Sequence, residues 1–489
     1  MKRIIIISII FGAAWTGHLS AQNANDAMLF SRYYAGGTAR SAGMSGAFGA
    51  LGGDLSVLSA NPAGLAVYRG SEFTFTPGFV FTKTRAKYDG NSFFDQNTHV
   101  IINNIGYVYT KNYYNEKGLQ TINFGIAYNR LSDFQSDTYI KRAKATSSLL
   151  DEFVYYANRN ESSPFYEELA LTTGALFQDD QGTYISDYND FGYGQPLYRS
   201  MSTGGGLGEY SFSMGFNFNH TLFLGATFGL QDLSYKEYYY HEENPGFSTM
   251  SDFNFTDEYS VNGFGVNFKA GVIYRPLQAL RLGAAIHTPT HFWMRPYQLT
   301  TMQTYWNLNP PPTDNDYWEA ESDPSERYRM RTPWRYSVSA ATVIGKLALA
   351  DVDVELVDYS NSSIMPKAIY DIENEDIAQI LKAAVNVKGG VEFRLGPVFL
   401  RGGAAYYGNP YNKNQFDADI RKNLKATMSY SGGIGFRHRD FYMDAAYSFT
   451  KHPEKTIDMY KWYDGDLWSE QAKLQTKAGK FILTFGFRF

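Results

Sequence analysis

The sequence predicts an all-β protein: a transmembrane antiparallel β-barrel of about fourteen strands, with an N-terminal plug in its lumen and short helices in its extracellular loops. Tyr, Phe and Trp make up 17% of the 489 residues, yet the mean hydropathy is polar at -0.36. This combination is typical of membrane-crossing strands, in which apolar and polar side chains alternate. Short and long connections also alternate along the chain, as periplasmic turns and extracellular loops do in such barrels.

The N-terminus has the features of a secretory leader. Met1-Lys2-Arg3 is positively charged, Ile4 to Trp15 is apolar, and small residues precede a cleavage site near Gln22. The apolar run is too short for a membrane anchor. We therefore predict a signal peptide at 1–21, an N-terminal plug, called the hatch, at 22–70 and a transmembrane barrel at 71–489.

The central part of the hatch, residues 36–64, favours neither a helix nor a strand. Glycine recurs too often for either, and Pro62 cannot donate to a sheet ladder. The segment is apolar enough to be buried, so we expect compact irregular backbone inside the barrel. Asn61 can bond its own backbone and Pro62 fixes φ. Asn61-Pro62-Ala63 is thus either a rigid turn where the hatch meets the wall, or a hinge or latch of the hatch.

Period-two alternation predicts the strands, as in 71–84, where phenylalanines alternate with threonine and valine. The last strand is aromatic and ends on Phe489, which resembles the C-terminal signal of outer-membrane barrels. The fourteen candidate strands are 71–84, 99–112, 118–131, 207–219, 221–240, 259–275, 279–298, 327–343, 346–360, 386–396, 398–408, 427–438, 440–451 and 479–489.

Two rows of charged residues indicate which face of the wall is polar. Because side chains alternate between faces, each row shares one parity: Arg327, Arg329, Arg331 and Arg335 in one strand, and Asp351, Asp353 and Glu355 in the next. An outward Arg or Lys at mid-bilayer costs about 2–4 kcal/mol, so we predict that both rows face the lumen. Arg335 should then lie near Glu355, and Glu392 near Arg401. These charges either brace wall and hatch, or leave an arginine to bind an anionic headgroup such as a carboxylate.

The loop at 132–206 is too long to lack structure in a compact protein. Its segments 147–156 and 164–171 are predicted to be short amphipathic helices, as is 369–384 in another loop. These helices either offer a landing surface to a hydrophobic ligand or pack on one another and on the rim.

A Gly/Ala-rich plug that ends in Asn61-Pro62-Ala63 and precedes fourteen strands resembles the FadL family of outer-membrane channels for hydrophobic compounds. The resemblance implies passive uptake of long-chain fatty acids or aromatic compounds in the outer membrane. It also implies movement of the hatch and lateral release through a gap at a kink in the third strand. That strand is 118–131 here, and its only interior glycine is Gly125, the predicted kink.

Other functions have less support. No HExxH, GxSxG or cysteine ligand set is present, so we predict no catalytic residues, no metal and no cofactor. No basic run indicates nucleic acid. The predicted partners are a hydrophobic small molecule and outer-membrane lipid. The alternative is a docking platform, similar to PorV of the type IX secretion machinery, with a protein partner at the extracellular loops.

Overall fold

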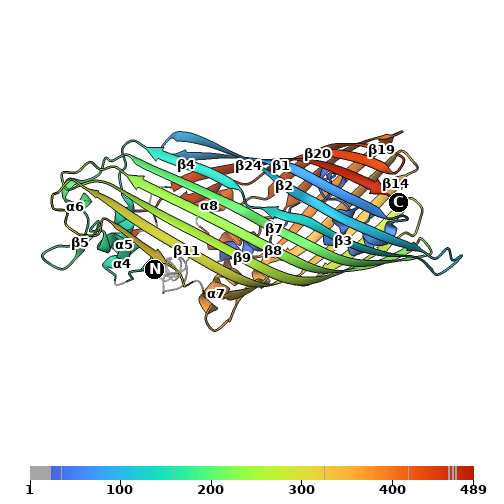
Figure 1. Cartoon of the computed structure of the whole chain (residues 1–489), viewed down its shortest axis with the longest axis horizontal. Helices are drawn as coiled ribbons and strands as arrows, with labels where there is room; N and C mark the ends of the chain where they lie inside the picture. The colour runs from blue at the N-terminus through green and yellow to red at the C-terminus, as the bar shows by residue number, and fades with distance from the viewer. Residues whose placement is uncertain are drawn as a thin grey trace.

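In a computed structural model, the chain forms a closed antiparallel barrel of fourteen spanning strands, as predicted (Figure 1). The structure describes residues 24–34, 36–159, 161–323, 325–416, 418–460, 463–464, 467–468 and 471–489. The predicted signal peptide lies outside the described residues. The first spanning strand pairs with both the second and the last, which closes the wall.

Several of the fourteen wall positions hold two strand segments in series. In order around the barrel they are β1 (Glu72–Tyr88), β2 (Asn91–Asn112), β3 (Leu119–Asp133) with β4 (Ser136–Arg142), β7 (Leu197–Phe218), β8 (Leu222–Glu243), β9 (Met250–Tyr274), β10 (Leu280–His287) with β11 (His291–Trp306), β14 (Arg335–Ile344) with β13 (Tyr328–Arg331), β15 (Ala348–Asp358) with β16 (Ser363–Met365), β17 (Ala383–Leu395), β18 (Val398–Tyr407), β19 (Thr427–His438), β20 (Phe441–Lys451) with β21 (Lys455–Asp458), and β24 (Gln471–Arg488). The minor strands are β5 (Phe177–Gln178), β6 (Tyr184–Ile185), β12 (Tyr317–Glu321), β22 (Tyr463–Asp464) and β23 (Leu467–Trp468).

The helices lie in the hatch and in the connections. The hatch contains α2 (Ala24–Ser31), α3 (Ala39–Gly43) and the 3₁₀ turns η2 (Leu55–Ser59) and η3 (Pro62–Val67); the loops contain α4 (Leu149–Ala157), α5 (Glu167–Thr172), α6 (Tyr188–Phe191), η4 (Tyr359–Asn361), α7 (Asp371–Ile380), η5 (Lys413–Gln415) and α8 (Ala418–Asn423). Among the described residues, no helix is both long and apolar enough to cross a bilayer.

The two ends of the barrel differ in the length of their connections. α4, α5 and α6 gather at the left end of Figure 1, where the long loops lie, and the C-terminus marks the other end. Tight turns with a positive-φ glycine, such as Gly345 and Gly396, lie at the end of the short connections. Many strands also continue several residues beyond the predicted bounds on the loop side, because the wall rises above its apolar belt as a polar rim.

The apolar belt follows from strand alternation. In β24, Phe481 and Phe487 are exposed, whereas the intervening Ile482 and Thr484 are fully buried. Similar outward aromatic and aliphatic side chains are present on every wall position of the barrel. An outward apolar surface of this kind is stable only against lipid. The lumen is filled at the short-turn end by the hatch, whose Leu55, Leu58 and Leu65 form a core with the wall.

Candidate functional site

Two wall carboxylates hold the centre of the hatch by its backbone. Asp353 accepts hydrogen bonds from the N–H groups of Phe48 (3.0 Å) and Gly49 (3.1 Å), and Asp351 accepts one from the N–H of Ala50 (3.2 Å). Both carboxylates are buried and face the lumen. Their place is the one that strand parity predicts, and their partners are backbone donors of the hatch that would otherwise be buried without acceptors.

The Asn61-Pro62-Ala63 motif sits on wall glycines. Asn61 caps η3 by accepting from the N–H of Ala63 (3.1 Å), and its Nδ2 donates to the carbonyl of Gly49 (2.7 Å). A Cβ atom on Gly271 would lie 1.9 Å from Asn61 Oδ1, and one on Gly225 would lie 2.2 Å from Pro62. Only glycine at these wall positions lets the motif approach so closely. The motif is therefore an anchoring point of the hatch.

Charged side chains join the hatch to the wall at two further places. Arg40 of α3 binds Glu392 (2.9 Å), which also binds Arg401 (2.8 Å). Arg401 in turn binds Asp444 (2.7 Å). The predicted proximity of Glu392 and Arg401 is confirmed, since the two are direct ladder partners.

The second place is at Arg335. It binds Glu355 (3.2 Å) across the β14–β15 hairpin and donates to the carbonyl of Ser31 at the end of α2. Arg335 pairs in the ladder with Val357 rather than with Glu355. The predicted ion pair is thus diagonal, two residues away from the predicted register.

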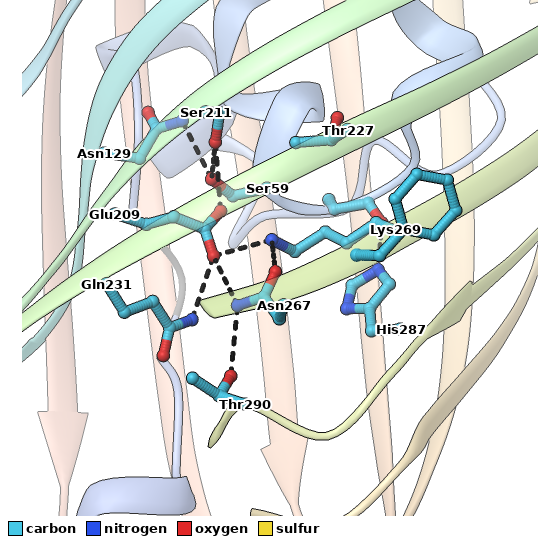
Figure 2. Close-up of polar contacts among 12 residues, drawn as sticks. Ser59, Asn129, Glu209, Ser211, Thr227, Gln231, Asn267, Lys269, His287 and Thr290 are labelled. Carbon is cyan, nitrogen blue, oxygen red and sulfur yellow. Dashed lines mark hydrogen bonds and ion pairs between the residues drawn. The ribbon is translucent and has the colours of Figure 1, made fainter. Parts of the chain in front are cut away.

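A buried polar network lies beside the end of η2 (Figure 2). Glu209 on β7 binds Lys269 Nζ on β9 (2.6 Å) and accepts from Gln231 (2.9 Å). Ser59 of the hatch joins this network by its hydroxyl contact with Ser211 (3.4 Å), which itself donates to Glu209. This network could not be predicted from a row of charges, because β7 and β9 each contribute one charge to it. The available signal was that Glu209 is the one charged residue within 200–218, and Lys269 the one within 259–274.

Above the centre of the hatch, α2 occupies an apolar chamber. We define the chamber by the buried residues packed together around α2: Phe30, Phe134, Leu207, Leu233, Tyr235, Tyr259, Val261, Phe292, Met294, Tyr328, Met330, Val357, Ile364 and Ile377. Phe30 is fully buried and lies edge-to-face against Phe134 and Tyr235. Ile377 of α7 belongs to this cluster, and α4 and α5 belong to a separate apolar cluster at the loop end. The loop helices therefore pack on the protein, which agrees with the second of the two predicted alternatives.

The wall is interrupted beside this chamber. The β2–β3 ladder extends from Asn112↔Thr121 to Asn104↔Asn129, and no backbone ladder joins β2 to β3 or β4 beyond that point among the described residues. Side chains close the gap instead: Asn97 donates to Asp137 (2.6 Å), and His99 lies 3.0 Å from Asp133. We call this gap, between residues 97–103 and 130–137, the seam.

The hatch and the apolar belt meet at the seam. Ser132 donates to the carbonyl of Arg32, and Tyr34 N–H donates to the carbonyl of Leu131, so the released edge of β3 binds the hatch. On the outside, Val100 and Ile102 of β2 are 68% and 51% exposed, which places part of the seam in the apolar belt. A route from the chamber to lipid would cross side chains here, with no ladder hydrogen bonds to break.

The interruption of the third strand is not at Gly125. That residue pairs regularly with Val108 and Ser213, and the register shifts between Arg130 and Ser132 instead. A Cβ atom on Gly125 would lie 3.1 Å from both Leu58 and Leu65 of the hatch. Gly125 leaves space for the hatch. The interruption lies where β3 stops pairing with β2 and binds residues 32–34 of the hatch instead.

The prediction that four arginines face the lumen is wrong for Arg327 and Arg329. Both are exposed, while the alternate residues Tyr328 and Met330 are buried in the chamber. Arg329 pairs with the outward Trp293. Thr332-Pro333-Trp334 separates β13 from β14 and changes the parity, so that Arg335 alone of the four is buried in the lumen, and Arg331 is half-buried.

Closed ladder, outward apolar belt and a lumen occupied by the chain's own N-terminal segment define a membrane-spanning β-barrel of the outer-membrane type with an internal hatch. The fold is that of FadL-type channels. A FadL homologue from Pseudomonas aeruginosa is 14% identical, with a TM-score of 0.54 over 94% of this chain and 100% of that chain. The toluene transporter TodX of P. putida is 12% identical, with a TM-score of 0.54 over 94% of this chain and 99% of that chain. No protein-family model and no curated protein sequence matches the chain.

Proposed function

We propose that the chain belongs to the FadL family and is an outer-membrane channel for passive uptake of hydrophobic small molecules, with long-chain fatty acids or aromatic compounds as substrates. The observation that carries this proposal is the contact between the apolar chamber and the seam at Phe134. Phe134 follows the end of β3, lines the chamber and contacts Phe30 of α2. An apolar site with few polar groups is suited to a hydrophobic ligand.

The proposed path has three steps. A ligand enters from the loop end and displaces α2 from the chamber. The loss of α2 weakens the contacts of residues 31–34 with Arg335 and with the released edge of β3. The ligand then leaves through the seam into the apolar interior of the outer leaflet. The name of TodX, a toluene transporter, supports this substrate class.

Uptake by cells that lack this barrel tests the proposal. Labelled fatty acid and toluene would be supplied to cells that carry wild type, Leu233→Glu or the control Leu347→Glu. Leu233 is buried in the chamber, whereas Leu347 is exposed in a short turn. We expect wild type and control to restore uptake and Leu233→Glu to abolish it, because an unpaired carboxylate is unfavourable in an apolar site. Folding of each variant would be checked by its heat-dependent gel mobility.

Uptake that wild type fails to restore, or that Leu233→Glu leaves unchanged, would contradict the proposal. A protein-docking role predicts a different result: a protein partner that co-purifies with the barrel, with uptake independent of Leu233.

A further inference from the structure

Three arginines on the outer face of the barrel line one groove. A cavity of about 430 Å³ lies between Arg295 of β11, Arg327 just before β13 and Arg329 in β13. Trp293, Met365 and Pro366 also line it. The groove combines guanidinium groups with an apolar floor. Met294 and Tyr328 line both the groove and the chamber, which lies on the other face of the same strands.

The groove lies at the edge of the apolar belt. Trp293 is 51% exposed and stacks on the outward Phe264, with ring centroids 6.3 Å apart. Exposed aromatic side chains at this level form the girdle that marks the membrane interface. Arg329 is the ladder partner of Trp293, and Arg295 lies two residues further toward the loops. The guanidinium groups therefore lie at the level of the lipid headgroups in the outer leaflet.

Two of the three arginines in the groove have no partner in the part of the chain that the structure describes. Arg295 and Arg329 form no hydrogen bond or ion pair with any residue that the structure describes. The ladder ends at the pair Met294↔Tyr328, and Arg295 and Arg327 are the next residues on the two segments. Like charges at opposed positions repel. An anion between them removes this repulsion, and phosphate accepts two parallel hydrogen bonds from a guanidinium group.

A second basic row lies about half of the circumference away. Lys83 of β1 pairs with Lys477 of β24, which pairs with Lys451 of β20. All three are exposed, and they lie just beyond the outward aromatic residues Phe81 and Phe449 of the same strands. Basic rows on both sides of one cylinder fit a surrounding lipid surface better than a single protein partner.

We propose that the arginine groove is a binding site for the phosphate groups of the anionic glycolipid in the outer leaflet, with the phosphate between Arg295 and Arg329 and the first part of an acyl chain on Trp293. The proposal rests on the membrane placement within the proposed function, and it is independent of transport. The bound lipid would orient the barrel in the membrane and cover the exposed guanidinium groups.

Native mass spectrometry of the full-length protein in detergent tests this site. The probes are bisphosphorylated lipid A, the same lipid without phosphates, and millimolar inorganic phosphate as a competitor. The variants are Arg295→Gln/Arg329→Gln and, as the matched control for lost charge, Lys117→Gln/Lys346→Gln in exposed short turns. Because one basic residue near an anionic surface contributes roughly fivefold in affinity, we expect the arginine variant to bind bisphosphorylated lipid A about 20-fold more weakly.

We further expect the control to bind like wild type, the dephosphorylated lipid to bind weakly everywhere, and inorganic phosphate not to displace the lipid. Equal binding of lipid A by wild type and the arginine variant would overturn the proposal. Displacement by inorganic phosphate would also overturn it, since the groove would then be a site for free phosphate. Unchanged uptake by the arginine variant separates this result from a failure of the transport proposal.

Discussion

Phe30 of the hatch lies edge-to-face against Phe134 of the wall, with ring centroids 6.0 Å apart and ring planes at 62°. Phe134 stands between β3 and β4, where the strand has left its neighbour β2. The pair therefore joins the helix that fills the chamber to the segment that forms the seam. In the proposed mechanism, this contact links occupancy of the chamber to closure of the seam.

The Phe30→Ala variant should release α2. Truncating a fully buried phenylalanine costs about 3–5 kcal/mol, which here weakens the docking of α2 rather than the barrel. We expect faster proteolysis within residues 24–34 under native conditions and unchanged heat stability of the barrel. Phe191→Ala, in the exposed α6, is the control. Equal proteolysis of the two variants would show that Phe30 does not hold the helix.

The Gly271→Ala variant should displace the hatch from its seat. The added Cβ would lie 1.9 Å from Asn61 Oδ1, so Asn61 must move and its hydrogen bond to Gly49 is lost. Gly402→Ala is the matched control, because nothing lies within 4 Å of its added Cβ. We expect higher ion conductance in planar bilayers for Gly271→Ala alone. Equal conductance would mean that the hatch tolerates loss of this seat.

The buried Glu209–Lys269 pair should show strong coupling. Removal of one partner leaves an uncompensated buried charge, which typically costs about 3–5 kcal/mol. We expect Lys269→Met alone to lower the temperature at which the barrel loses its folded gel mobility. The double variant Glu209→Gln/Lys269→Met should recover part of that loss, with a coupling of at least about 1 kcal/mol. Additive effects would show that the two groups act independently.

The stability of the loop segment 161–176, which contains α5 and is called the cap here, should fall as pH rises. Burial raises the pKa of Glu167 in α5 to about 8, above its ordinary value of about 4.3. The folded cap therefore favours the protonated carboxyl, and the stability that this proton contributes is lost between about pH 4 and pH 8. Glu167→Gln keeps an acceptor for the Ser163 N–H. After correction for the intrinsic exchange rate, hydrogen exchange in residues 161–176 should accelerate with pH more steeply in wild type than in Glu167→Gln. An equal dependence on pH in the two proteins would contradict a raised pKa of Glu167.

Strand alternation predicted most of the architecture, because lipid outside and hatch inside impose opposite polarity on successive residues. Asp351, Asp353 and Glu355 were placed correctly for this reason. Parity failed at Arg327 and Arg329, since Pro333 interrupts the strand and the local pattern does not show that the faces exchange. The seam was misplaced because it depends on long-range pairing: β3 leaves β2 where residues 32–34 bind Leu131 and Ser132.

Lateral release through the seam can be tested by closing the seam reversibly. The chain has no cysteine, so Asn97→Cys/Asp137→Cys can be joined across the seam by a short bifunctional thiol reagent that reductant cleaves. The control, Lys83→Cys/Gln96→Cys, places the same link across a continuous ladder. We expect that linking the seam reduces uptake of labelled hydrophobic substrate to background and that reductant restores it. The linked control should transport normally. Full uptake through a linked seam would contradict lateral release.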